Sequence, residues 1–118
     1  MSKSAPVLVQ YVLIRSDLKW PTGALIAQAC HACTAVMHLF REDPNVKSYT
    51  EDYTRMHKVV LEAKDEESLT KVSESLTSDN KDFHLWIEQP ENIPTCIATK
   101  PYHKEEIQTY FKKFKLFK

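Results

Sequence analysis

The sequence predicts an α/β fold in which a mixed four-stranded sheet is sandwiched between helices. Apolar segments of strand length at residues 7–14 and 57–63 are separated by a long helical segment, residues 23–40. This alternation predicts right-handed crossovers and parallel strand pairing. Later in the chain, a short connection between Pro90 and Pro94 joins two further strand-length segments, which permits an antiparallel pair. The expected order of elements is therefore β-α-α-β-α-β-β-α.

Residues 1–118 are expected to form a single domain, because a chain of this length can bury about two thirds of its extended surface. The almost wholly apolar residues 7–14 are typical of a buried strand. Asp43 followed by Pro44 predicts the start of a second, shorter helix that continues through Tyr49. The second strand follows at residues 57–63.

The segment at residues 23–40 has the spacing of an amphipathic helix. At about 100° per residue, one narrow stripe collects its small and polar side chains: Ala24, Ala27, Gln28, His31, Thr34, Ala35 and His38. We expect the remaining, apolar arc to pack against the sheet; it contains Leu25, Ile26, Ala29, Cys30, Ala32, Cys33, Val36, Met37, Leu39 and Phe40. One simple interpretation is that Gln28 and His31 form a hydrogen-bonded pair under a loop.

Two more helices and two more strands are expected in the second half of the chain. Asp65 predicts the cap of a helix that ends near residues 78–80. Its apolar face is formed by Leu69, Val72 and Leu76. Residues 83–88 and 95–99 are strands, and a final helix begins near His103. Its core stripe is expected at Ile107, Tyr110, Phe111 and Phe114.

The composition argues against several classes of protein. The formal net charge is zero, so the chain lacks the overall positive field of strongly basic nucleic-acid-binding proteins. Gly23 is the only glycine, which leaves no glycine-rich loop for a nucleoside triphosphate. No apolar run reaches the roughly 20 residues of a membrane span, and residues 1–6 lack a secretory cleavage region. We therefore expect a soluble, cytoplasmic protein without a membrane partner.

The three cysteines are expected in the core. Cys30 and Cys33 form a C-x-x-C pair, but Cys30 stands about two turns into its helix, away from the terminal dipole that activates redox thiols. Zinc would need a second close pair of ligands. The sequence offers only separated candidates: Cys96, His57, His84 and His103. We expect neither a metal nor another cofactor.

Lysines are concentrated at the C-terminus, where residues 100–118 contain six of them against Glu105 and Glu106. Lysines suit the C-terminal end of a helix because its dipole is negative there, so a solvated helix end explains them. The alternative is a contact with nucleic-acid phosphates, which would be weak and sensitive to salt.

Several motifs resemble a known enzyme family. The pattern R-S-D-L-K at residues 15–19, followed by G-x-x-x-A-Q-x-x-H-A at residues 23–32, is similar to the start of the type 2 peptidyl-tRNA hydrolases of archaea and eukaryotes. M-H-K-V-V-L at 56–61 and T-C-I-A-T-K-P at 95–101 resemble the second and last strands of that family. L-W-I-E-Q-P-E-N-I at 85–93 and the C-terminal K-K-F-K-L-F-K resemble its divergent branch of peptidyl-tRNA hydrolase domain-containing proteins.

The resemblance implies hydrolysis of the ester between a peptide, or an N-blocked amino acid, and tRNA. That reaction needs an activated water, a donor to the developing oxyanion and positive charge for phosphates. His31 or Glu88 could accept the proton of the water, and Gln28 or Thr95 could donate to the oxyanion. The candidate substrate-binding residues are Asp17, Lys19, Trp20 and Lys100. Trp20 could instead cap the core, or it could stack on the terminal adenine.

Two departures from the family pattern support a second hypothesis. Enzymes of the family carry a lysine directly after the glycine that opens the first helix, where this chain has Ala24. They also carry an aspartate followed by alanine and glycine at the end of the third strand, where this chain reads E-Q-P-E from Glu88. The alternative is a catalytically weak or inactive member that binds tRNA or a protein, such as a component of protein quality control. The resemblance also suggests a homodimer.

Overall fold

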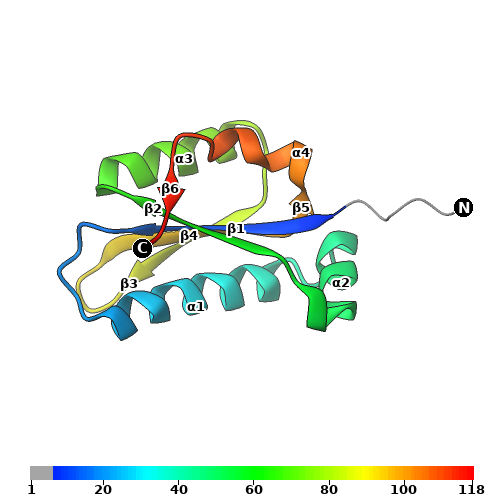
Figure 1. Ribbon diagram of the computed structural model, residues 1–118, viewed down its shortest axis with the longest axis horizontal. Helices are drawn as coiled ribbons and strands as arrows, with labels where there is room; N and C mark the ends of the chain where they lie inside the picture. Colours follow the sequence, from blue (N-terminus) through cyan, green and yellow to red (C-terminus); the bar gives the residue numbers. More distant parts are fainter. Residues whose placement is uncertain (1–6) are drawn as a thin grey trace, which may run out of the picture.

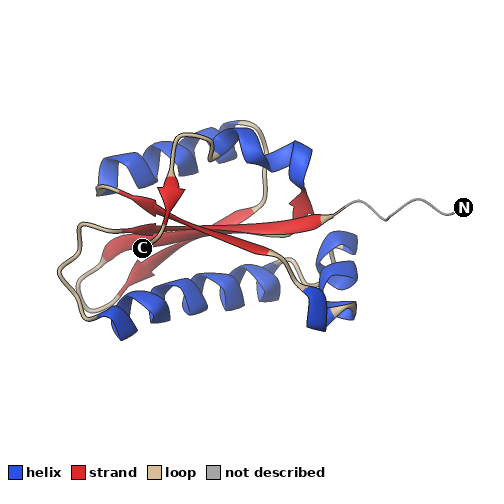
Figure 2. Cartoon of the chain, viewed as in Figure 1, coloured by secondary structure: helices blue, strands red, loops and turns tan. Residues whose placement is uncertain are grey.

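The computed structural model describes residues 7–118, which form a central mixed sheet with helices on both faces (Figures 1 and 2). The helices, in chain order, are α1 (Thr22–Leu39), α2 (Pro44–Glu51), α3 (Glu66–Ser78) and α4 (Lys104–Ile107). Helices α1 and α2 lie on one side of the sheet, and α3 and α4 lie on the other (Figure 1). This arrangement confirms the predicted α/β class. The prediction about a cleavage region falls on residues 1–6, outside the described residues.

The strands are β1 (Leu8–Arg15), β2 (Lys58–Ala63), β3 (Phe83–Glu88), β4 (Ile93–Thr99), β5 (Tyr102–His103) and β6 (Lys115–Leu116). Their order is β3-β4-β1-β2-β6, with β5 paired to the start of β1. The parallel β1–β2 pair and the antiparallel β3–β4 pair are both as expected. The sheet is larger than the predicted four strands because β5 and β6, at two residues each, are too short to produce a periodic pattern.

Alternate residues of β1 contribute to two cores, one on each face of the sheet. Val9, Tyr11 and Leu13 pack with the apolar residues of α3 and α4, whereas Val12 and Ile14 pack with α1. This follows from the two-residue period of a strand, and it explains why the predicted strand has no polar face. The strand extends one residue past the expected end, so that Arg15 is its last residue.

The prediction for the apolar arc of α1 is partly wrong. Ile26 and Leu39 are 58% and 54% exposed, and Cys30 is exposed too, while Gln28 is buried. The helix rests on the half of the sheet that contains β3 and β4, so only a stripe at i, i+4 spacing faces the core. The fully buried members of that stripe are Gln28, Ala32 and Val36.

The expected long C-terminal helix is also wrong. Helix α4 ends at Ile107, a 3₁₀ turn follows at Gln108–Tyr110, and the chain then returns to the sheet as β6. The apolar residues at helical spacing are still used, because Ile107 and Phe111 are buried and Phe114 packs against them. Backbone pairing with β2, including the Phe117 N–H to Val60 carbonyl bond of 3.0 Å, satisfies the polar groups that a longer helix would have paired.

Helix α3 is as predicted, since the Asp65 carboxylate accepts from the Ser68 backbone N–H at 2.8 Å and caps it. The predicted strand at residues 95–99 begins earlier, at Ile93, and Pro94 lies beside the irregularity between Trp86 and Ile87. Across the described residues, no helix combines the length and the apolar character that a membrane span requires.

Lys100 is buried between two acidic side chains at the far end of β4. Its Nζ lies 2.5 Å from Asp43 Oδ2 and 2.9 Å from Asp82 Oδ2. Burial alone would raise the pKa of Asp43, but the hydrogen bonds from Lys100 and from the backbone of Asn45 outweigh it and hold that pKa below its ordinary value. The cluster therefore joins β4 to the segment before α2.

Replacing Lys100 with methionine is expected to lower the free energy of unfolding at neutral pH by about 1–3 kcal/mol. A carboxyl group with a lowered folded pKa stabilises the fold above the unfolded pKa, and this contribution is lost as the pH falls through the folded value. The difference in the free energy of unfolding between the unmodified protein and Lys100→Met should thus be smaller at about pH 3 than at neutral pH. Urea denaturation at both pH values measures it. The matched control is Lys47→Met, whose exposed pairing with Glu42 is expected to contribute about 0–1 kcal/mol.

Candidate active site

The four candidate catalytic residues lie on α1, β3 and β4. Two of them, Gln28 and Thr95, form a buried pair between α1 and the sheet, with exposed fractions of 2% and 0%. The Thr95 hydroxyl donates to Gln28 Oε1 at 2.8 Å, and Gln28 Nε2 donates to the Ala24 carbonyl at 3.3 Å. The amide nitrogen is therefore directed toward the N-terminal end of α1.

The other two candidates, His31 and Glu88, are connected through Trp86. The His31 ring stacks on the indole with a centroid separation of 4.6 Å and an interplanar angle of 16°. The indole Nε1 donates to Glu88 Oε1 at 2.8 Å. His84 meets the same indole edge-on at 6.1 Å, and burial lowers the pKa of His84. His31 is exposed, so its imidazole is accessible to water.

The two pairs are neighbours in the fold. Trp86 of β3 is directly opposite Cys96 of β4, which follows Thr95, and Gln28 and His31 stand one turn apart on α1. Gln28 and His31 do not bond to each other, contrary to the simple interpretation. Gln28 faces the sheet and accepts a hydrogen bond from Thr95, while His31 lies over the edge strand β3 and stacks on Trp86.

Arg15 organises the entrance to α1, although the sequence analysis did not select it. Its guanidinium makes two bonds to Asp17, of 3.0 and 2.8 Å, and a third of 3.1 Å to the Pro94 carbonyl. It also lies 3.4 Å from Glu66 Oε1. The hydrogen bond from Arg15 holds the pKa of Asp17 below its ordinary value, against the effect of burial. Asp17 is thus occupied by Arg15, and the β1–α1 loop is fixed beside Thr95.

The remaining substrate-binding candidates are not all close together. Lys19 is exposed and Trp20 is half-buried in the β1–α1 loop, near the start of α1. Lys100 instead follows the last residue of β4, with residues 96–99 of that strand between it and Thr95. Its ammonium is held by Asp43 and Asp82. The structure therefore separates Lys100 from the other candidates.

One of the three cysteines expected in the core, Cys30, is instead at the surface. Cys96 is buried as expected, but Cys30 is exposed on α1. Burial raises the pKa of Cys33 and of Cys96, so both thiols are protonated near neutral pH. Among residues 7–118, no group of three histidine, cysteine or acidic side chains is placed to hold a metal ion.

Sequence reasoning missed Arg15, Trp86 and His84. Arg15 had a detectable signal, because a charged residue directly after a buried strand and two positions before Asp17 can bond back to that carboxylate. Trp86 and His84 had none, since Trp86 reaches His31 across more than 50 residues of sequence, and His84 joins the site only through its edge-on contact with Trp86. The assembled site offers an exposed imidazole, a buried amide donor and a carboxylate held by an indole.

Comparisons with known proteins identify relatives over almost the whole chain. Residues 8–117 match the sequence model of the family described as peptidyl-tRNA hydrolase PTH2. A mouse (Mus musculus) protein named "Putative peptidyl-tRNA hydrolase PTRHD1" is 56% identical, over 95% of this chain and 84% of its own length. The human (Homo sapiens) protein of the same name is 55% identical, with the same coverage.

A solved structure from Agrobacterium tumefaciens strain C58, titled as a protein of unknown function, has the same fold. It superimposes with a TM-score of 0.67 over 94% of this chain and 98% of its own, at 14% sequence identity. At that identity the similarity supports the arrangement of helices and strands and nothing further.

Proposed function

The chain belongs to the peptidyl-tRNA hydrolase PTH2 family, and from this premise we propose that it hydrolyses the ester between a peptide and the tRNA that carries it. The observation that carries the proposal is the family match over residues 8–117, which extends from β1 to β6. An exposed imidazole and an amide donor one turn apart on α1 supply the groups that ester hydrolysis needs.

In this proposal His31 is the proton acceptor. The oxygen of a water attacks the ester carbonyl carbon, and the proton of that water passes to the imidazole. When the bond between the carbonyl carbon and the ribose oxygen breaks, the imidazole returns the proton to that oxygen. The products are the free peptide acid and a tRNA with a free ribose hydroxyl. Stacking on Trp86 fixes the plane of the imidazole, so little rotation is needed before the proton is transferred.

Gln28 is proposed as the donor to the oxyanion, and Thr95 as the residue that positions it. The Thr95 proton is directed at Gln28 Oε1, so Thr95 does not donate to the substrate. The Gln28 amide nitrogen has two N–H donors, and one of them donates to the Ala24 carbonyl at 3.3 Å. The other is the donor proposed for the oxyanion. Because Thr95 already holds the amide in place, little free energy is needed to reorient it as negative charge develops on the oxyanion. Donors oriented in advance in this way are the basis of oxyanion stabilisation.

Glu88 positions the site through Trp86. Its carboxylate accepts the indole N–H and so holds the ring on which His31 stacks. Lys19 and Trp20, in the β1–α1 loop, are proposed to contact the end of the tRNA. Asp17 acts indirectly, because its bonds to Arg15 hold this loop against the Pro94 carbonyl.

The test is release of a labelled N-acetyl amino acid from tRNA by the purified chain, with EDTA present in a parallel reaction. We expect turnover that exceeds spontaneous ester hydrolysis in both reactions. Release at the spontaneous rate by a folded protein that still binds tRNA would overturn the hydrolase proposal and favour a binding module.

Ala24 gives a second test. Its side chain is half-buried in the first turn of α1, and its carbonyl accepts from the Gln28 amide. A lysine at this position would add positive charge beside the proposed oxyanion site, so Ala24→Lys is expected to raise kcat, by up to about 10-fold. The matched control is Ile26→Lys, which places the same charge on the exposed side of the helix. Equal rates for the two variants would contradict the assigned site.

A further inference from the structure

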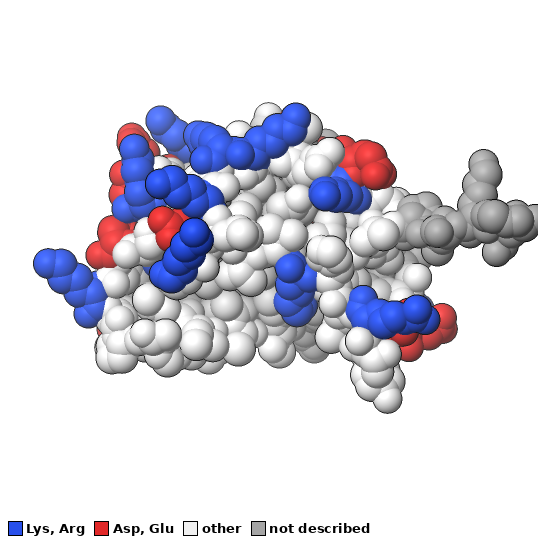
Figure 3. Space-filling model, viewed as in Figure 1, with Lys and Arg blue, Asp and Glu red and all other residues white. Residues whose placement is uncertain are grey.

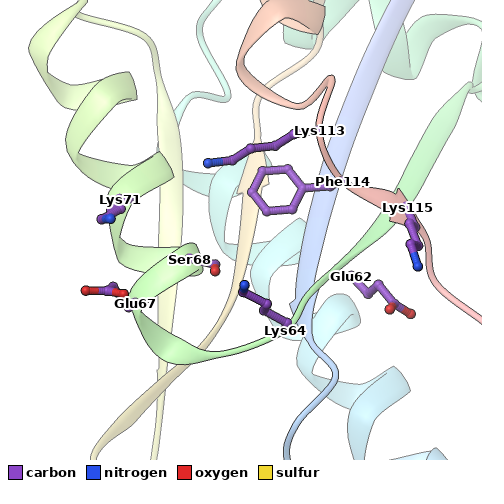
Figure 4. Close-up of a pocket in the computed structure, with 8 residues that line it drawn as sticks. All are labelled: Glu62, Lys64, Glu67, Ser68, Lys71, Lys113, Phe114 and Lys115. Atoms are coloured by element: carbon purple, nitrogen blue, oxygen red, sulfur yellow. The ribbon is translucent and has the colours of Figure 1, made fainter.

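A lysine-rich hollow of about 430 Å³ lies between the end of β2, the start of α3 and the C-terminal segment. Four lysines contribute to its wall: Lys64, Lys71, Lys113 and Lys115. We call this hollow the lysine pocket. Figure 4 shows Lys64 and Lys113 extending toward the same space from opposite sides, with the Phe114 ring between them. The pocket therefore brings together side chains from three segments of the chain.

The lysines of the pocket are free to bind an anion. Among residues 7–118, no carboxylate oxygen lies within 4.0 Å of their Nζ atoms. The ion pairs in this part of the chain involve Arg15, Lys47, Arg55 and Lys100 instead. Glu62 and Glu67 also line the pocket, so four positive and two negative charges give it a net charge of +2. Figure 3 shows lysine and arginine side chains gathered over α3 and the C-terminal segment, while the surface over α1 is almost uncharged.

The backbone that carries Lys113 and Lys115 is held in place by packing and by strand pairing. Phe114 packs against the core, and the Lys113 ammonium lies 5.5 Å from the centre of its ring. Lys115 is in β6, opposite Glu62 of β2. The segment is fixed again by the Phe117 N–H bond to Val60. Because these backbone positions are fixed, the main entropy cost of binding an anion would be the ordering of the lysine side chains.

The pocket and the candidate active site are at the same end of the strands, but the pocket is on the α3 face beside β2 and β6, whereas His31 is on the α1 face over β3. Ala63 of β2 pairs with Arg15 of β1, and Lys64 is the next residue. Arg15 in turn bonds to the Pro94 carbonyl, next to Thr95, and lies 3.4 Å from Glu66 at the start of α3. A polymer bound at the pocket would reach the residues proposed for catalysis by passing around this end of the sheet, past the β1–α1 loop.

Lysines also line the surface on the side of the pocket away from the active site, together with Asp79 and Glu74. Lys71 and Lys113 line two further hollows between α3 and the segment at residues 109–113. Lys112 joins them in the first of these hollows. Lysines spaced along adjoining hollows, with carboxylates at the far end, fit a chain of phosphates better than they fit a single small anion.

We propose that the lysine pocket binds backbone phosphates in the acceptor arm of the tRNA, while the ester lies near His31 and Gln28. The proposal rests on the proposed function, because it takes tRNA as the ligand. It assigns Lys113 and Lys115 to substrate binding rather than to a solvated helix end, since this part of the predicted helix is a turn followed by β6 and both lysines line the hollow.

The test measures binding separately from hydrolysis. Fluorescence anisotropy gives the Kd of uncharged tRNA, and of a hairpin that contains only its acceptor arm, between about 50 and 200 mM salt. In the double variant Lys71→Gln/Lys113→Gln, the slope of log K against log salt should become shallower by about 1.4–1.8, from roughly 0.7–0.9 per lost phosphate contact. The matched control is Lys47→Gln/Lys104→Gln, which removes two exposed lysines outside the pocket.

A variant with the opposite expected effect guards against misfolding as the explanation. Glu67→Gln removes a negative charge from the pocket wall, so it should tighten binding of the acceptor-arm hairpin by about 2- to 5-fold at low salt. A misfolded variant would not bind more tightly. Circular dichroism of each variant confirms that its helix content is unchanged.

The outcomes separate this proposal from the proposed function. An unchanged slope in the Lys71/Lys113 variant, an equal loss in the control, or a loss seen with whole tRNA but not with the hairpin would overturn the pocket proposal. None of these results would affect hydrolysis by His31 and Gln28. Absent hydrolysis with lysine-dependent hairpin binding would overturn the hydrolase proposal and leave the pocket in place.

Discussion

Replacing His31 with phenylalanine is expected to lower kcat for ester hydrolysis by about 10²- to 10⁴-fold. Phenylalanine keeps an aromatic ring that can stack on Trp86 at the observed 4.6 Å, but it has no nitrogen to accept the proton of the attacking water. Because His31 is exposed, the fold should tolerate the change. KM should change little, since the imidazole is assigned to the transition state and not to tRNA binding.

Single-turnover release of a labelled N-acetyl amino acid from tRNA measures this effect. The control is His38→Phe, which alters another exposed histidine near the C-terminal end of the same helix. His38→Phe should retain full activity. If His31→Phe also retained it, the imidazole would be a stacking partner only, and the proton acceptor would have to be sought at Glu88.

Replacing Gln28 with methionine is expected to lower kcat by about 10²- to 10³-fold, the usual effect of removing one donor to an oxyanion. Methionine has a similar length but no amide proton. The change also leaves the buried Thr95 hydroxyl without its acceptor at 2.8 Å, so the free energy of unfolding should fall by about 1–3 kcal/mol. Activity and urea denaturation are both measured.

The double variant Gln28→Met/Thr95→Val separates the two consequences. It removes both polar partners, so much of the lost stability should return, whereas activity should remain as low as in Gln28→Met. Thr95→Val alone should reduce kcat by only about 10-fold, because it leaves the amide in place without its orienting bond. Recovery of activity together with stability would show that Gln28 supports the fold and not the reaction.

Local sequence patterns predicted the elements with long periodic segments. Asp65 and the spacing of Leu69, Val72 and Leu76 defined α3, and the apolar run before Arg15 defined β1. The pattern failed at the C-terminus, where Ile107, Phe111 and Phe114 have helical spacing, but the chain forms a short helix, a 3₁₀ turn and the strand β6. There, pairing with β2 outweighs the weak local preference for a helix.

The candidate site was predictable to the extent that its residues belong to recognisable motifs. Gln28, His31, Glu88 and Thr95 were chosen from those motifs, and the fold places them on adjoining parts of α1, β3 and β4. Their pairing was not predictable, because helical spacing put Gln28 and His31 on one stripe. How α1 sits on the sheet decides which of the two faces the core.

The sequence by itself determined the α/β class, the parallel and antiparallel strand pairs and the family, because each depends on periodicity or on contiguous motifs. Only the tertiary structure decided that Lys100 is held by Asp43 and Asp82, that Arg15 bonds to the Pro94 carbonyl, and that four lysines surround one hollow. The physical reason is that these contacts join residues distant in the chain. Their geometry is set by how the layers pack, and no local pattern of residues records it.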